Sequence, residues 1–284
     1  MSSQTSKLVV VTVVKDDIEG FDRTCRSIAE QSVPVTHLII NGGSSADMQR
    51  ALDDWSGRIG SRIISGPDNG PYDAMNKALR ALDSRDRVWF INAGDTLAFD
   101  EAYAYVDQLT SSDEFTWGFG PVKVVEKSGI LRTIPAQATY TQLHHAYGQT
   151  PICHQAVVAC VDALRLAGGF DDRYPIAADY RSLLLLGRIA APVQWELPTV
   201  EYRAGGLSDR HLLRSHWQQH RIRIEVFNGG MKARARSWAR LAGMTARITT
   251  GRGIDAIARA GLVDRDWRRP RRNEQSMDNP RHGQ

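Results

Sequence analysis

"LVVVTVV", which runs from residue 8 to residue 14, is the stretch that decides the fold class of this chain. Its residues are apolar except for one threonine, and nearly all of them are β-branched, which favours a β-strand. An uninterrupted run of this kind is typical of a strand that is buried on both faces, as in a parallel sheet covered by helices. The sequence therefore predicts an α/β protein whose sheet contains this strand.

Strands and helices continue to alternate as far as residue 95. The expected helices cover residues 18–31, 44–55 and 71–82, and the other expected strands cover residues 35–41, 61–65 and 87–92. Ser44 or Ser45 is the expected N-cap of the second helix. Such alternation predicts a mostly parallel sheet, and ligands bind beyond the carboxyl ends of its strands. The loops "KDD" (15–17), "NGGSS" (41–45) and "NAGD" (92–95) are therefore the first places to look for a site.

The pattern changes after residue 99. The expected elements are a helix over residues 99–109, a hairpin over 115–134 with its turn at 127–129, an irregular stretch to Pro151, a strand within 154–160, a helix over 179–190, strand-like pieces within 192–203, and helices over 210–228 and 232–250. The last eighteen or so residues are rich in Arg, Pro, Asn and Gln, which predicts disorder.

Composition limits the class of protein. The chain has 284 residues, of which 42% are hydrophobic, enough for one large domain or for a domain with an appendage. Three cysteines cannot all pair, which favours reduced thiols in a cytoplasmic protein. The sequence shows no secretory signal pattern, and no apolar run approaches the roughly 18 residues of a membrane helix. The glycine motifs of dinucleotide sites, the Walker loop and the serine-hydrolase elbow are all missing.

The segment "PDNGPYDAMNKALRAL", residues 67–82, combines an ordinary helix with unusual polar chemistry at its start. Pro71 suits the first helical position, and the residues before it suit a turn. The apolar stripe of this helix is Ala74, Met75, Ala78, Leu79 and Leu82. Asp73 and Lys77 are one turn apart and are expected to form an exposed ion pair. Asp68 and Asn76 are interpreted instead as site residues.

The loop "NAGD" follows a strongly apolar strand, so Asn92 and Asp95 are expected at the edge of the sheet where ligands bind. An exposed carboxylate there can hold Mg²⁺ or Mn²⁺, with water and a substrate diphosphate supplying the other ligands. A second interpretation is that Asp95 caps the next helix. Similarly, Asp179 in "IAADY" is either a general base or an acid at a helix N-terminus. The residues alone leave both alternatives open.

Seven motifs in this order resemble those of family 2 glycosyltransferases with the GT-A fold, most of all the bacterial branch that builds exopolysaccharides and glycolipids. They are "TVVKDD" at 12–17, "NGGSS" at 41–45, "PDNGPYDAMNKAL" at 67–79, "NAGD" at 92–95, "HQ" at 154–155, "GGFDDRYPIAADY" at 168–180 and "GGLS" at 205–208. The resemblance covers about residues 7–208. It implies a GT-A catalytic domain over 1–208, a basic helical extension over 209–265 and a disordered tail over 266–284.

The resemblance also implies a role for each matching residue. The residues expected to contact the nucleotide-sugar donor are Thr12, Asn41, Gly43, Asp68, Asn76 and Asn92. Asp95 matches the metal-binding acid of the family's Asp-x-Asp motif, and Asp179 matches the acid that serves as catalytic base. His154 and Gln155 are expected on the acceptor or sugar side. Two positions depart from the family pattern, because Asn41 stands for an aspartate and Gly94 for the first metal-motif acid.

The function implied is an inverting transfer of a sugar from a nucleotide-diphosphate donor to a hydroxyl of a glycan or glycolipid. The donor nucleotide is expected to be UDP or dTDP, with GDP as a further candidate, and the cofactor to be Mn²⁺ or Mg²⁺. The leaving diphosphate needs a cation and the attacking hydroxyl needs a base, so Asp95 and Asp179 supply the minimum. The alternative is a non-catalytic protein that binds nucleotide sugars or glycans, which the reduced metal motif and Asn41 suggest.

Charge is distributed unevenly along the chain. Residues 1–202 carry 18 Lys and Arg against 25 Asp and Glu, a net charge of −7, whereas residues 203–284 carry 18 against 7, a net charge of +11. In the predicted helix over 232–250, Arg236, Arg240 and Arg247 lie opposite Trp238, Leu241, Met244 and Ile248. This pattern fits a helix on an anionic membrane surface or one packed on its own domain. Because family acceptors are often lipid-linked, we favour a cytoplasmic protein at the inner face of the cell membrane, and specific nucleic-acid binding is disfavoured.

Overall fold

A computed structural model of the chain describes residues 6–43, 45–126, 128–129, 131–136, 140–147, 152–206, 210–227 and 230–259, the last of these ranges as backbone only from residue 251. The chain divides into two compact units, residues 1–241 and 242–284. Both β-sheets lie in the first unit.

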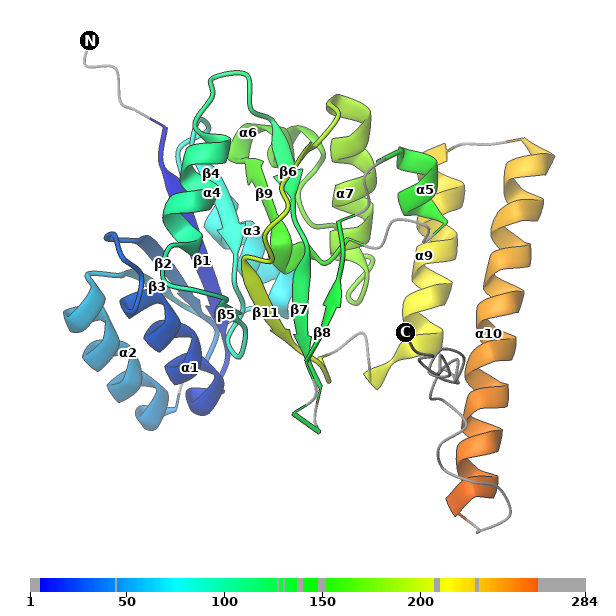
Figure 1. Cartoon of the computed structure of the whole chain (residues 1–284), viewed down its shortest axis with the longest axis horizontal. Helices are drawn as coiled ribbons and strands as arrows, with labels where there is room; N and C mark the ends of the chain where they lie inside the picture. Colours follow the sequence, from blue (N-terminus) through cyan, green and yellow to red (C-terminus); the bar gives the residue numbers. More distant parts are fainter. Residues whose placement is uncertain are drawn as a thin grey trace, which may run out of the picture. The chain divides into compact units, whose positions relative to one another are not determined.

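The larger sheet has seven strands in the order β10-β6-β9-β4-β1-β2-β3 (Figure 1). Their bounds are β1 (Leu8–Val14), β2 (Thr36–Asn41), β3 (Arg62–Ser65), β4 (Arg87–Phe90), β6 (Trp117–Phe119), β9 (Val157–Cys160) and β10 (Val193–Gln194). β1 pairs in parallel with both β2 and β4, and all seven of its residues are buried. β9 is antiparallel to β4 and β6. The predicted mostly parallel central sheet, with "LVVVTVV" as a strand buried on both faces, is confirmed.

The smaller sheet has the order β5-β11-β7-β8, with β5 at Thr96–Leu97, β7 at Val122–Val125, β8 at Leu131–Ile134 and β11 at Val200–Arg203. β7 and β8 form an antiparallel hairpin, as predicted, although Lys127 of its predicted turn lies outside the described residues. The prediction was wrong for β6, which belongs to the larger sheet. A Cβ at Gly120 would lie 1.9 Å from Trp195 Nε1, so the indole ring packs directly on the chain just after β6.

Helices cover both faces of the larger sheet. One face carries α3 (Pro71–Ala81), α6 (Val161–Leu166) and α7 (Ala178–Ile189), whose apolar side chains share one core with β1 and β4. The other face carries α1 (Ile18–Ala29), α2 (Ala46–Ile59) and α4 (Ala102–Thr110), and α4 packs there together with the smaller sheet. In Figure 1, α1 and α2 lie beside the β1–β3 part of the sheet. This leaves the edge formed by the carboxyl ends of β1 and β4 open for a site.

The local signals in the first 82 residues behave as predicted. Pro71 is the first residue of α3, and Ser45 caps α2 by accepting a hydrogen bond from the Met48 N–H at 3.2 Å. Lys77 Nζ and Asp73 Oδ2 lie 4.0 Å apart and are partly exposed, so the expected ion pair forms. Ser44, the other predicted N-cap, lies outside the described residues.

The C-terminal helices are α9 (Leu212–Phe227) and α10 (Met231–Arg259), and a short α5 (Gln142–Ala146) precedes the 3₁₀ turn η1 (His154–Ala156). Both long helices were predicted. Ile222 and Val226 of α9 join the core that contains Leu184 of α7. No helix in the described ranges is long and apolar enough to cross a membrane. The boundary at residue 208 stays a prediction, and the tail 266–284 lies outside the described residues.

Candidate active site

A pocket of about 560 Å³ opens beyond the carboxyl ends of β1 and β4. It is lined by residues of the "KDD" and "NAGD" loops, of η1, of the start of α7 and of β11. Among the predicted site residues, those that line it are Asn92, Asp95, His154, Gln155 and Asp179. The structure therefore brings together the predicted base, the predicted metal ligand and the predicted acceptor-side pair, which come from three separate parts of the sequence.

Asp179 is fixed at the pocket wall by contacts to both of its oxygens. It is the second residue of α7, whose N-cap is Ala177. Its Oδ1 accepts hydrogen bonds from the hydroxyl of Tyr72 and from the N–H of Tyr180, both at 2.8 Å. Its Oδ2 lies 3.1 Å from His154 Nδ1. Asp179 is thus not the helix cap that the sequence left open, and a quarter of its side chain remains exposed (25%).

The surroundings of Asp179 favour its ionised form. Burial acts to raise the pKa of the carboxyl, but the hydrogen bond and charge of His154, the Tyr72 hydroxyl and the Tyr180 N–H act together to lower it. The net result is a pKa below the ordinary aspartate value. Asp179 is therefore a carboxylate at neutral pH and has the protonation state that a proton acceptor requires.

His154 connects Asp179 to Asn92. Its Nδ1 faces Asp179, and its Nε2 lies 3.2 Å from Asn92 Nδ2. A proton on Nδ1 donates to the carboxylate, and Nε2 of the neutral ring accepts from the amide, whereas a protonated ring adds its positive charge to the contact with Asp179. The other polar atom of this amide, Asn92 Oδ1, is buried and has no hydrogen-bond partner among the described residues. A ligand in the pocket can supply that partner.

Asp95 is more deeply buried than Asp179, with 5% of its surface exposed. Its Oδ1 accepts from the backbone N–H of Arg203 at 3.0 Å, and its Oδ2 accepts from Gln155 Nε2 at 3.1 Å. Burial raises the pKa of Asp95 to about 6, although both hydrogen bonds and the charge of His154 oppose this. These contacts come from β11 and η1, so Asp95 does not serve as the cap of the following helix, which was the second interpretation.

The departure at Gly94 has a structural reason. Its φ of 102° lies in the left-handed region, which glycine adopts without strain and other residues rarely do. Its N–H bonds to Thr24 Oγ1 at 3.0 Å, and the same hydroxyl donates to the carbonyl of Asp95 at 2.7 Å. An acidic side chain at position 94 would therefore strain the turn that directs Asp95 into the pocket.

The residues present fit a divalent cation that takes most of its ligands from elsewhere. Within the described ranges, no group of three or more His, Cys, Asp or Glu side chains could hold a metal by itself. Asp95 offers one carboxylate, and the unpartnered Oδ1 of Asn92 offers a second oxygen from the same loop. Mg²⁺ and similar hard ions usually keep waters and use substrate phosphates beside one or two carboxylates.

Two adjacent residues of η1 each contact a different one of the two pocket carboxylates. His154 contacts Asp179, whereas Gln155 donates to Asp95 and accepts at Oε1 from the Cys153 thiol at 2.8 Å. Gln155 is buried, and its carbonyl accepts from the Trp89 indole at 2.7 Å. The acceptor-side role of this pair stays a prediction, but the described contacts show that each residue orients a different carboxylate.

The predicted nucleotide-side residues lie where the loops after β1, β2 and β3 meet. Asn41 closes its own loop, since its Oδ1 accepts from the Gly43 N–H at 2.9 Å and its Nδ2 donates to the Gly43 carbonyl at 3.1 Å. A Cβ at Gly43 would lie 2.6 Å from Asp16 Oδ1. Asp68 is buried against these loops, and its Oδ1 lies 4.0 Å from Lys15 Nζ. Lys15 also lines the pocket, so this cluster adjoins it.

Thr12 and Asn76 do not line the pocket. Thr12 is fully buried, and its hydroxyl lies 3.0 Å from His37 Nε2 in the sheet. Both polar atoms of the Asn76 amide are used by Phe170, donating to its carbonyl at 2.7 Å and accepting from its N–H at 3.0 Å. Asn76 therefore fastens the chain before α7 to α3. The donor contacts expected of these two residues stay predictions.

Tyr72 and Arg203 have roles that the sequence did not predict. Tyr72 is a hydrogen-bond donor to Asp179, and its position at the start of α3 within "PYDAMNK" was the available signal. Arg203 donates to Asp95 through its backbone N–H. Every residue except proline has such a group, so the identity of the side chain does not predict this contact.

Comparison with known proteins gives the fold a name. No family model matches the chain. It is 28% identical over 203 residues to the uncharacterized glycosyltransferases MT1564 and Rv1514c from two strains of Mycobacterium tuberculosis, covering 70% of this chain and 75% of each relative. Among solved structures it resembles S. aureus TarS in complex with UDP (TM-score 0.58, 14% identity, 85% of this chain and 71% of that chain). The fold is that of the GT-A glycosyltransferases.

A second solved structure has the same fold. It is the mannosyltransferase PcManGT from Pyrobaculum calidifontis in complex with GDP-Man and Mn²⁺, with a TM-score of 0.56, 15% identity, and coverage of 92% of this chain and 84% of that chain. At these identities the structural likeness concerns the GT-A fold. Together with the named relatives, it supports a glycosyltransferase.

Proposed function

We propose that this protein is an inverting glycosyltransferase that moves a sugar from a nucleotide-diphosphate donor to a hydroxyl of a glycan or glycolipid. The observation that carries the proposal is the arrangement of two carboxylates in one pocket at the carboxyl edge of a GT-A sheet. Asp179 is held ionised by His154 and Tyr72, whereas Asp95 is buried and oriented by Gln155. This division suits one base and one cation ligand.

In the proposed mechanism, Asp179 accepts the proton of the acceptor hydroxyl as the new bond forms between the hydroxyl oxygen and the anomeric carbon. The bond from that carbon to the diphosphate oxygen breaks, and its electron pair leaves with the diphosphate. Tyr72 and His154 hold the Asp179 carboxylate in place, so that its reactive oxygen need not reorganise during the reaction.

Asp95 would hold the divalent cation, Mn²⁺ or Mg²⁺, with Asn92 Oδ1 as a second candidate oxygen. Such a cation neutralises charge that develops on a leaving diphosphate. Gln155 and the Arg203 N–H fix the direction of the Asp95 carboxylate. The presence of Mn²⁺ in the PcManGT complex supports metal use in this fold.

The donor nucleotide is proposed to be UDP or dTDP, with GDP as a further candidate. The complexes of TarS with UDP and of PcManGT with GDP-Man support a nucleotide-diphosphate donor without choosing between them. Asn41, Gly43 and Asp68 are the proposed nucleotide-side residues, because they cluster beside the pocket near Lys15. Thr12 and Asn76 are proposed to act on the donor indirectly, Thr12 through its contact with His37 in the sheet and Asn76 through the chain before α7 that it holds.

The experiment that tests the function is a donor screen. Thermal shift with UDP-, dTDP- and GDP-sugars, each with and without Mn²⁺, should identify one nucleotide class that stabilises the protein only when the metal is present. A nucleoside-diphosphate release assay with that donor should then show turnover. Donor binding without turnover for every acceptor offered would favour the alternative, a non-catalytic protein that binds nucleotide sugars.

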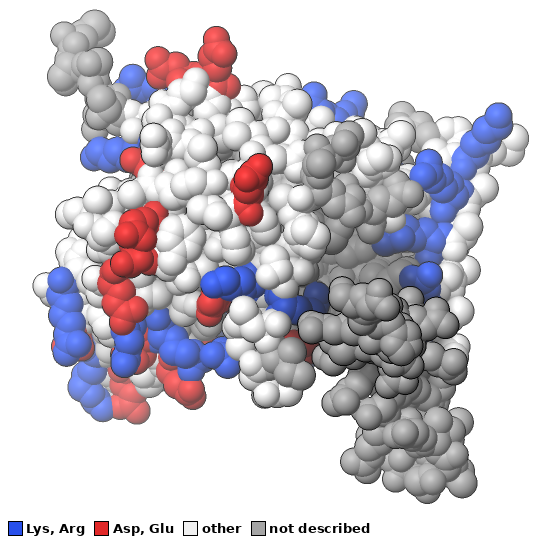
Figure 2. Space-filling view, in the orientation of Figure 1, with Lys and Arg blue, Asp and Glu red and all other residues white. Residues whose placement is uncertain are grey.

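We also propose a peripheral contact with anionic membrane through the basic C-terminal region. Figure 2 shows Lys and Arg side chains over α10, with no coloured acidic side chain among them in that view. Lys232 and Arg234 are exposed at the start of α10, which also carries the exposed Trp238, and the Trp238 ring lies 5.8 Å from the exposed ring of Trp217 on α9. Basic side chains next to exposed aromatic rings suit the headgroup region of an anionic bilayer.

A further inference from the structure

The segment from Gly168 to Ala177 delivers Asp179 to the pocket. It begins with two consecutive glycines in the left-handed region, Gly168 with φ 86° and Gly169 with φ 63°. A Cβ on Gly169 would lie 2.7 Å from Asn76 Oδ1, so the chain passes close to α3 at this point. Because the segment ends just before Asp179, its position sets the position of that carboxylate.

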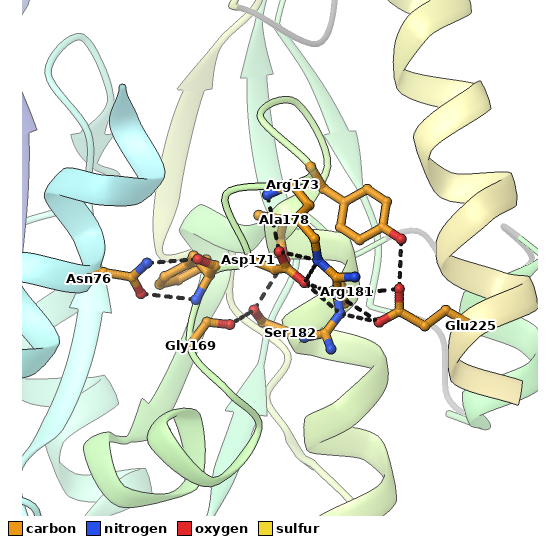
Figure 3. A network of polar contacts seen from close by, with 10 residues as sticks. Asn76, Gly169, Asp171, Arg173, Ala178, Arg181, Ser182 and Glu225 are labelled. Carbon is orange, nitrogen blue, oxygen red and sulfur yellow. Dashed lines mark hydrogen bonds and ion pairs between the residues drawn. The ribbon is translucent and has the colours of Figure 1, made fainter. Parts of the chain in front are cut away.

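The first half of this segment is fastened to α3 and α7. Asn76 on α3 makes two hydrogen bonds with the backbone of Phe170, as Figure 3 shows. Ser182 on α7 donates to the carbonyl of Gly169 at 2.5 Å. These contacts come from two helices that cover the central sheet, and both of them involve only the first half of the segment.

The second half is held mainly by α9, with one further contact from α3, because the Tyr72 hydroxyl also lies 3.1 Å from the carbonyl of Ile176. Gln218 Oε1 accepts hydrogen bonds from two consecutive backbone N–H groups, that of Ile176 at 3.0 Å and that of Ala177 at 3.1 Å. Gln218 is buried, with 6% of its surface exposed. Ala177 is the N-cap of α7 and makes no side-chain hydrogen bond of its own, and Gln218 accepts from its N–H as the Glu or Gln of a capping box does.

A second contact from α9 reinforces the first. Glu225 accepts from the Tyr174 hydroxyl at 2.7 Å and from Arg181 Nε at 3.0 Å. Asp171 and Arg173 complete this network, with Arg173 contacting both acids (Figure 3). The network is largely exposed at Arg173 and carries less weight than the buried bonds of Gln218. The two contacts lie two turns apart on α9, on the side that faces α7.

From this geometry we infer that Gln218 is a positioning residue for Asp179, and that α9 thereby helps to set the geometry of the catalytic centre. The inference rests on the proposed function, because it assigns to α9 the placement of the proposed base. Gln218 touches neither Asp179 nor the pocket in the described contacts. It acts by fixing the two residues that precede α7.

The physical reason is that one buried oxygen accepts from two consecutive backbone donors. If that oxygen is removed, the N–H of Ile176 loses the acceptor described for it, and the N–H of Ala177 keeps only the longer bond to the Tyr174 carbonyl at 3.2 Å, so the segment must move to find water or another acceptor for Ile176. Asp179 lies two residues beyond Ala177 and moves with it. A displacement of about 1 Å in a catalytic group can lower a rate by roughly 100-fold.

The test compares three variants of the full chain. Gln218→Met keeps the length of the side chain but removes the acceptor oxygen, whereas Gln218→Glu keeps an oxygen in the same place. Gln219→Met makes the same change at the adjacent position, where the side chain contacts only His216 among the described hydrogen bonds. For each, we would measure kcat and donor KM per folded molecule, together with deuterium uptake of the peptide that contains Ile176 and Ala177.

For Gln218→Met the inference predicts a kcat lower by about 10- to 100-fold, a donor KM within about twofold of the parent, and faster deuterium uptake at residues 176–177. Gln218→Glu should keep slow uptake and recover most of the lost kcat, and Gln219→Met should match the parent protein. A merely structural role would lower the amount of folded protein but not the kcat of the molecules that are folded.

Three results would overturn the inference. One is unchanged uptake in Gln218→Met, which means that the contact does not hold the segment. Another is faster uptake with an unchanged kcat. The third is a Gln218→Glu protein as slow as Gln218→Met, which means that the acceptor oxygen is not what matters. If the parent protein turns over no donor, the proposed function fails and the positioning role falls with it, while deuterium uptake still reports whether Gln218 holds the segment.

Discussion

Asp95 and Asp179 line the same pocket, but their surroundings drive their protonation in opposite directions. Asp95 is buried, receives two neutral hydrogen bonds, and has a pKa raised to about 6. Asp179 is partly exposed, is held by His154, Tyr72 and a backbone N–H, and has a lowered pKa. His154 makes much of this difference because it contacts Asp179 directly, whereas the hydrogen bond from Gln155 to Asp95 offsets only part of the effect of burial.

The comparison shows how one fold can assign two jobs to two aspartates. An acid that its protein neighbours keep ionised, without a bound cation, can take a proton from a substrate. An acid that is partly neutral near pH 6 becomes a stable anion once a cation joins it, so Asp95 gains most from a positive ligand. The opposite shifts therefore support the proposed base at Asp179 and the proposed cation site at Asp95.

The largest expected effect is that of Asp179→Asn. This change removes the proton acceptor but keeps the size of the side chain, so kcat should fall by about 10³-fold. The dissociation constant of the donor, measured by calorimetry, should change little because the acceptor side is affected. Asp172→Asn is the matched control, since Asp172 is an exposed acid of the same segment. Near-normal turnover by Asp179→Asn would end the base assignment.

The next largest effect is expected for Asp95→Asn, which should lower metal-dependent turnover by about 100-fold or more. The same Asp95→Asn substitution should also raise the free energy of unfolding when a chelator keeps the protein free of metal. The folded-state pKa of Asp95 is raised, so its protonated form stabilises the fold at low pH, and that stabilisation is lost as the pH rises from about 4 to about 6. An asparagine does not titrate and avoids this loss.

The stability part of this prediction can be checked with melting curves in EDTA between pH 4 and pH 8. The melting temperature of Asp95→Asn should rise relative to the parent as the pH increases through 4–6, reach a gain of about 2–6 °C, and then stay constant. A gain in melting temperature that does not depend on pH would show that the pKa of the Asp95 carboxyl is not raised in the folded protein. A lower melting temperature throughout would show that its two hydrogen bonds matter more than its charge.

How far the sequence predicts this centre is best seen in the same two aspartates. The alternating pattern that starts at "LVVVTVV" predicts the parallel sheet. Because ligands bind beyond the carboxyl ends of parallel strands, it also predicts that "NAGD" lies at the site. What determines the chemistry of Asp95, however, is a backbone N–H of Arg203 and the amide of Gln155, which are 108 and 60 residues away in the chain. Periodicity and local motifs do not encode such contacts.

The same limit explains the other missed features. β6 was assigned to a hairpin because its neighbours in sequence are strands, but its pairing partners are β9 and β10 in the larger sheet. Tyr72 lies in a quoted motif, yet its bond to Asp179 spans 107 residues. Gln218 lies in a basic helix whose composition suggested a surface role. In each case tertiary packing decides, and the local sequence allows more than one outcome.

A smaller effect is expected for His154→Leu. His154 lowers the pKa of Asp179, so its removal raises that pKa, and the acid limb of the kcat/KM profile should move to higher pH with a loss of about tenfold in kcat. His154→Gln keeps a neutral donor and should shift the limb less. His144→Leu is the control, because His144 is a half-buried histidine on α5 that does not line the pocket. An acid limb that stays in place in His154→Leu would remove His154 from the account.

The smallest effect is expected at the membrane surface. Replacing Lys232 by Gln should weaken cosedimentation with phosphatidylserine vesicles about fivefold, since each basic residue near such a surface contributes about 1 kcal/mol. Binding to phosphatidylcholine vesicles is the control and should be weak for both proteins. Equal binding of the parent and the variant to anionic vesicles would contradict the membrane proposal without touching the catalytic one.

The most direct test of the central comparison is a titration of the two carboxyl groups in the metal-free protein. Carbon-13 NMR of Asp side chains, assigned with Asp95→Asn and Asp179→Asn, would follow each group from pH 3 to pH 8. The account predicts that Asp95 titrates near pH 6 and that Asp179 is already ionised below the ordinary aspartate range. Titration of both groups near pH 4, or the reverse order, would contradict it.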